Sequence, residues 1–129
     1  MPFVLVVTLA IHVLAGVFWA GTSFVLAKTG GSGGDRLFGP QMAAALIAVI
    51  AGAYLWSAMH TAGGVLILGA AAALIAAAVQ VTLGGRALRL RRQAVISEAA
   101  AQARIAVAQR IAAGLLAVTI ITMVAAPYV

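Results

Sequence analysis

One uncharged stretch constrains the fold of this chain more than any other feature. From Gln41 to Gly85, 45 consecutive residues include no Asp, Glu, Lys or Arg. A single helix of that length would extend about 68 Å, because each residue adds about 1.5 Å. The hydrocarbon core of a bilayer is only about 30 Å thick. We therefore expect two membrane spans here, about 41–59 and 61–84, joined by a turn within 57–64, where small and polar residues gather.

Two further spans flank this stretch. The 25 residues from Phe3 to Ala27 carry no charge, which is enough for a first span at 3–27. The segment 28–40, "KTGGSGGDRLFGP", reads as a loop, with Pro40 in the first turn of the next helix. A basic connection follows at 85–104, and the fourth span is expected at 105–126. Its helix is expected to begin early, near Val95, because the residues that follow are strong helix formers.

The composition predicts the fold class. Hydrophobic residues make up 65% of the 129 positions, and only eight basic and two acidic side chains are present. A water-soluble domain needs more polar surface than this. Glycine and alanine are abundant in the last three spans, and small residues let membrane helices approach closely. We expect an all-α, integral membrane four-helix bundle that forms a single domain over residues 1–129.

The basic residues indicate an orientation. The turn at 57–64 has none, whereas the first and third connections carry Lys28, Arg36, Arg86, Arg89, Arg91, Arg92 and Arg104. The positive-inside rule places both connections in the cytoplasm and both termini outside. Nucleic acid is a poor candidate partner, because these charges follow one membrane face.

The chain has only two histidines, His12 and His60, and both are expected within the membrane. His12 lies 16 residues before Lys28, about 24 Å of helix, and His60 lies 20 residues after Pro40, about 30 Å. The two imidazoles are therefore expected at similar depth on different helices. Ionisable groups inside a membrane usually serve a function. The alternatives without a cofactor are a hydrogen bond from His12 to a neighbouring helix and an interfacial position for His60.

The neighbours of both histidines predict a cofactor site. His12, Gly16 and Trp19 fall on one helical stripe, and Gly63 and Gly64 lie beside His60. A flat cofactor between helices needs gaps of the kind that glycine leaves next to its ligand. Trp19 has a plain alternative role as a packing residue in the bundle core or at the membrane interface.

Two imidazoles on facing helices suit axial ligation of the iron of haem b. They are too few for a closed zinc site, which takes four ligands. Copper is an alternative, with Met42 and Met59 as soft ligands, although packing is the commoner role of such methionines. Absence of cysteine excludes thiolate metal sites and disulfides. The only acids, Asp35 and Glu98, lie in the basic connections, which counts against a proton-coupled exporter.

The pattern of His12, Trp19 and Gly21 near the start of the first span resembles the CopD-like and HemJ-like families of bacterial membrane proteins. The HemJ-like proteins have four spans, are implicated in protoporphyrinogen oxidation and hold b-type haem. The resemblance implies that His60 corresponds to their third-span histidine and Lys28 to an arginine that closes their first span. In these proteins a lysine follows the third-span histidine by two residues, and this chain has Ala62 there.

These observations predict a membrane haem protein that transfers electrons or carries out other redox chemistry. The alternatives are a HemJ-like protoporphyrinogen oxidoreductase, a CopD-like copper-handling protein and a packing subunit with no cofactor. Any redox chemistry would belong to the cofactor, because no nucleophile with an acid–base partner is evident. A quinone or another redox protein is the expected electron partner, and a homo-oligomer is compatible with the small-residue helices.

Overall fold

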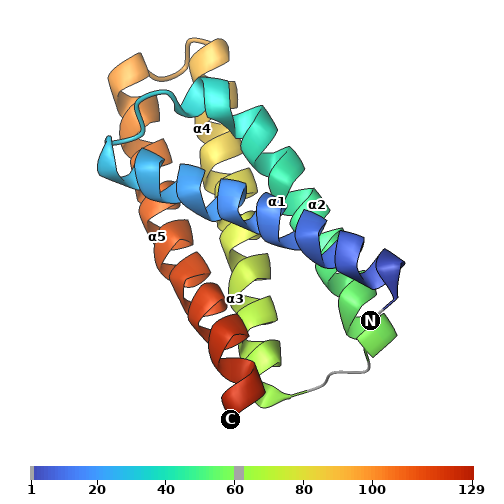
Figure 1. Cartoon of the computed structure of the whole chain (residues 1–129). Coiled ribbons are helices and arrows are strands. Elements are labelled where there is room, and N and C mark those ends of the chain that lie inside the picture. The colour runs from blue at the N-terminus through green and yellow to red at the C-terminus, as the bar shows by residue number, and fades with distance from the viewer. Residues whose placement is uncertain (1, 60–62) are drawn as a thin grey trace.

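The computed structural model describes residues 2–59 and 63–129, and these form four membrane-length helical segments (Figure 1). The first two are α1, Phe3–Lys28, and α2, Gly34–Met59. The third joins α3, Gly64–Val79, through the π-helical segment η1, Gln80–Gly84, to α4, Gly85–Arg92. The fourth is α5, Glu98–Ala125, extended by the 3-10 turn η2, Ala126–Tyr128. The predicted all-α four-helix membrane bundle is confirmed.

The first connection is shorter than predicted. Helix α2 already begins at Gly34, so that only residues 29–33 separate it from α1. Pro40 was expected in the first turn but lies inside α2, six residues after its start. The prediction of a loop over 28–40 was therefore wrong. Asp35 in the first turn favours the start of a helix, because its carboxylate meets the positive end of the helix dipole.

The third connection is also mostly helical. The basic segment continues as α4 to Arg92, and α5 begins at Glu98, so that only 93–97 connects them. The hydroxyl oxygen of Ser97 accepts a hydrogen bond from the amide of Ala100 at 3.1 Å and caps α5. The expected early start of the fourth helix, near Val95, agrees with α5. The assignment of 85–92 to a connection was wrong, since arginine, alanine and leucine are strong helix formers and a helix need not end at the bilayer edge.

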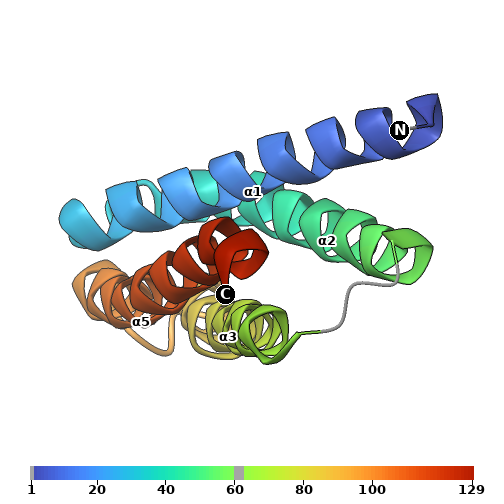
Figure 2. The same cartoon turned by 60° about the horizontal axis from the view of Figure 1, so that its bottom comes forward.

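The helices pack as two pairs. Helix α1 packs mainly against α2 and also crosses α5, and α3 packs mainly against α5. Helices α2 and α3 follow one another in the chain but contact each other little. They diverge toward Met59 and Gly64, as Figure 1 shows, and Figure 2 shows α1 lying across the other helices. The interior is built largely of alanine, as the abundance of small residues predicted.

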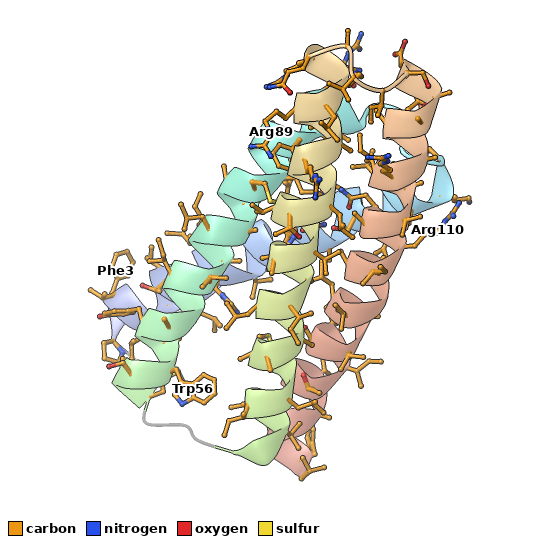
Figure 3. The ribbon with its side chains drawn as sticks, turned by 180° about the vertical axis from the view of Figure 1, so that it is seen from behind. Phe3, Trp56, Arg89 and Arg110 are labelled. Carbon is orange, nitrogen blue, oxygen red and sulfur yellow. The ribbon has the colours of Figure 1, made fainter. Side chains whose placement is uncertain are left out.

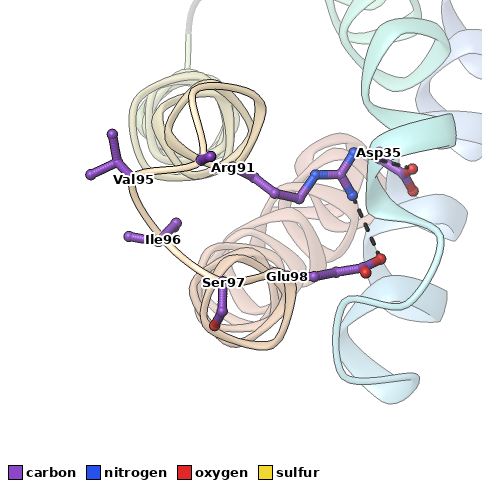
Figure 4. A pocket seen from close by; sticks show the side chains of 7 residues that line it. Asp35, Arg91, Val95, Ile96, Ser97 and Glu98 are labelled. Carbon is purple, nitrogen blue, oxygen red and sulfur yellow. Dashed lines mark ion pairs between the residues drawn. The ribbon is translucent and has the colours of Figure 1, made fainter.

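The two short connections lie at the same end of the bundle, opposite the C-terminus (Figure 1). Arg91 joins them, because its guanidinium contacts the Asp35 carboxylate at 3.6 Å and the Glu98 carboxylate at 3.9 Å. Figure 4 shows this arrangement around a surface pocket that the 94–98 segment also lines. A polar contact thus ties the start of α2 to α4 and α5 outside the uncharged part of the helices.

Candidate functional site

His12 lies half-buried on the face of α1 that packs against α2. Its Nδ1 atom is 2.8 Å from the carbonyl oxygen of Ala48. A carbonyl can only accept, so Nδ1 donates and carries the proton. In the neutral ring with this tautomer, Nε2 has a free lone pair. Metal-binding histidines commonly hold their second nitrogen in this way.

Gly52 provides the room for the His12 ring. An ideal Cβ at position 52 would lie 2.9 Å from His12 Cε1 and 3.3 Å from Nδ1, which is too close for an undisturbed ring. Gly52 lies one turn after Ala48, so that the ring is held between a hydrogen bond and a bare backbone. Trp56 follows after another turn, and Figure 3 shows its side chain pointing from α2 toward α3.

His60, the second predicted ligand, lies outside the described residues. The structure does describe Gly63 and Gly64, which cap and begin α3. Both are exposed, and a Cβ at either would meet no atom within 4 Å. The two glycines thus border open space, as a gap beside a cofactor requires, but their association with His12 stays a prediction.

The other two predicted cofactor neighbours differ from each other. A Cβ at Gly16 would meet nothing within 4 Å, so this glycine leaves space next to the turn that carries His12. Trp19 is only 3% exposed and belongs to the alanine-rich core. Its Nε1 donates a hydrogen bond to Gln80 Oε1 at 2.7 Å. Trp19 therefore has the packing role, which was the alternative to a role beside the cofactor.

Sequence reasoning missed a second polar cluster, in which every long helical segment takes part. We call the following residues the glutamine layer: Trp19 and Ser23 from α1, Gln41 from α2, Gln80 from η1 and Gln109 from α5. All are buried. Gln41 and Gln109 exchange two amide hydrogen bonds, at 3.2 and 3.0 Å. Gln80 Nε2 donates to Gln109 Oε1 at 3.0 Å and to Ser23 Oγ at 2.8 Å.

Further hydrogen bonds link the glutamine layer to α1, and one of them runs from Gln41 Nε2 to Thr22 Oγ1 at 3.1 Å. The Ser23 hydroxyl donates to the carbonyl of Trp19 at 2.8 Å, and Gln41 also donates to Ser23 at 3.1 Å. Among the described residues, no buried side-chain nitrogen or oxygen lacks a hydrogen-bond partner. The layer therefore holds the helices together. One feature of the sequence could have indicated this cluster: the second, third and fourth expected spans each contain one glutamine.

Met42 and Met59 cannot bind one copper ion together. Both lie on α2, 17 residues apart, which corresponds to about 26 Å along the helix. A shared ion would need both sulfur atoms within bonding distance. Over residues 2–59 and 63–129, no group of three His, Cys, Asp or Glu side chains gathers either. Of the two predicted histidine ligands, His12 is the one whose surroundings can be described.

No protein-family model, curated protein or solved structure matches this chain. The chemistry of the site therefore has to be inferred from the residues themselves. His12 offers one neutral imidazole nitrogen, oriented by Ala48 and given room by Gly52.

Proposed function

We propose that this chain is a small integral membrane protein that binds b-type haem, in which His12 Nε2 would bind the iron. The observation that carries the proposal is the hydrogen bond between His12 Nδ1 and the carbonyl oxygen of Ala48. It fixes the tautomer that leaves Nε2 free and makes the ring a better ligand. The alternative, a histidine that only joins α1 and α2, needs the same clearance at Gly52, and haem binding itself decides between the two.

The second ligand in this proposal would be His60. The sequence supports it, because His60 is the only other histidine of the chain and Gly63 and Gly64 follow it closely.

A bound haem would supply the single-electron chemistry, and the protein would set its ligation and surroundings. His12 would hold the iron, the Ala48 carbonyl orients His12, and the apolar helices would keep water from the site. Electron exchange with a quinone or another membrane redox protein is the function that such a site would serve.

The orientation proposed for the chain places the end with Asp35, Arg91 and Glu98 in the cytoplasm. This end carries the connections 29–33 and 93–97 and the arginines of α4. Basic residues near short connections are retained on the cytoplasmic side. The C-terminus then lies in the periplasm, and the membrane is the bacterial inner membrane.

The optical spectrum of the purified protein tests the proposal. After expression with ample haem, we expect a low-spin, six-coordinate b-type spectrum and one haem per chain. One haem per two chains would mean that the ligands come from different subunits. A protein that purifies colourless and gains no such spectrum when haem is added would contradict the proposal, and copper in place of iron by elemental analysis would favour the alternative cofactor.

Replacement of Gly52 by alanine should weaken haem binding without removing any ligand. The new Cβ would collide with the His12 ring and turn Nε2 away from the iron. Changes of this kind behind a metal ligand lower affinity about 10- to 100-fold, and haem titration followed by absorbance measures the change. Gly21→Ala on α1 is the matched control, since its Cβ would meet nothing within 4 Å. Equal affinities of Gly52→Ala and Gly21→Ala would contradict the role of Gly52.

A further inference from the structure

Arg110 lies on the lipid-facing side of α5. The residue is exposed, and its neighbours in sequence on the same side are apolar. Val107 is 48% exposed and Ile111 is 42% exposed. Figure 3 labels Arg110 on α5, in the half of the bundle that contains the 93–97 connection. Arg110 is the one basic residue of the sequence that lies within an expected membrane span, the fourth span at 105–126.

The glutamine layer gives the depth of Arg110. The hydrogen bond between Gln80 and Gln109 puts these residues at one level, and Arg110 follows Gln109 directly. Gln80 lies 16 residues, about 24 Å, from the start of α3 at Gly64. A hydrocarbon core of about 30 Å that begins at Gly64 would therefore extend about 6 Å beyond this level. Arg110 lies inside the edge of the hydrocarbon, close enough for its guanidinium to reach the headgroups.

The protein does not neutralise this charge. The chain has eight basic and only two acidic side chains, and both acids, Asp35 and Glu98, contact Arg91. Over the described residues, Arg110 forms no ion pair. A guanidinium at the hydrocarbon edge is costly unless an anion meets it. Since no described acidic side chain pairs with Arg110 and its neighbours on α5 are apolar, a lipid headgroup is the anion that this position can meet.

We propose that Arg110 binds the headgroup phosphate of an anionic phospholipid at the lipid-facing side of α5. The guanidinium donates paired hydrogen bonds to phosphate oxygens, which suits its fork geometry. The acyl chains of the lipid lie along Val107, Ile111 and the following exposed residues of α5. This site is independent of the haem proposal, because α5 does not carry His12 or His60.

Native mass spectrometry of the purified full-length protein tests the proposal, with phosphatidylglycerol and phosphatidylcholine added separately. We expect the first phosphatidylglycerol to bind more tightly than the first phosphatidylcholine. Arg110→Gln should weaken that phosphatidylglycerol about fivefold, which corresponds to about 1 kcal/mol for one cation at the membrane surface. Arg110→Lys should retain most of the affinity, since it keeps the charge.

Arg92→Gln is the matched control. It removes the same charge from an exposed position at the end of α4, outside the uncharged stretch, and should change the affinity less than twofold. Circular dichroism checks that each variant is folded. Equal affinity of the wild-type protein for the two lipids would overturn the proposal, whether or not the variants fold. An Arg110→Gln affinity equal to wild type, or a loss of the same size in Arg92→Gln, would also overturn it.

Discussion

Replacement of His12 by alanine is expected to abolish haem binding, so that the protein purifies colourless from cells supplied with haem. Alanine cannot ligate iron, and the structure offers no second imidazole near Ala48 and Gly52 within the residues that it describes. An open coordination position in an apolar medium would also lack the water that fills such positions elsewhere. The haem content per chain, measured by absorbance after purification, gives the result.

Two further variants make this result specific. Thr8→Ala changes a side chain on the same stripe of α1 whose hydroxyl donates only to the carbonyl of Val4, and it should keep the full haem content. His12→Gly should regain haem when imidazole is added, because free imidazole can replace the lost ligand. Haem content of His12→Ala equal to that of Thr8→Ala would contradict ligation by His12.

Replacement of Gln109 by alanine should lower the free energy of unfolding by about 3 kcal/mol. The variant loses the three hydrogen bonds of Gln109 to Gln41 and Gln80, and Gln41 Oε1 loses its donor. Hydrogen bonds between membrane helices average about 0.6 kcal/mol each. A buried polar atom without a partner adds about 1–3 kcal/mol. Unfolding in mixed micelles with increasing SDS, followed by the fluorescence of the two tryptophans, measures the change.

Gln93→Ala is the control for the glutamine layer. Gln93 is exposed in the short connection between α4 and α5, and its replacement should change the stability by less than about 0.5 kcal/mol. If Gln109→Ala and Gln93→Ala unfold at the same SDS fraction as the wild-type protein, the layer does not hold the helices together.

The number of helices could be predicted from the sequence, whereas their ends could not. The length of an uncharged stretch measures how often the chain crosses the bilayer, since the hydrocarbon thickness is fixed. Charged residues indicate where the chain leaves the hydrocarbon, but a helix can continue beyond that point. Gly85–Arg92 and Gly34–Gly39 are helical although they hold the charges that marked them as connections.

The candidate site could be predicted only in part. His12 is conspicuous because a histidine is rare in a membrane helix, and its chemistry follows from its type. Its orientation depends on Ala48 and Gly52, which have no chemical signature in the sequence. The glutamine layer was missed for a related reason. A single glutamine in a membrane span does not indicate a cluster. Gln41, Gln80 and Gln109 are seen to lie at one depth, within hydrogen-bond distance, only once the helices are packed together.

Electron paramagnetic resonance of the oxidised, purified protein tests ligation by His12 most directly. Two neutral imidazoles on one ferric iron predict a low-spin signal, which should disappear in His12→Ala. A low-spin signal that persists in His12→Ala would contradict His12 as the ligand. A copper signal in place of the ferric one in the wild-type protein would contradict haem as the cofactor.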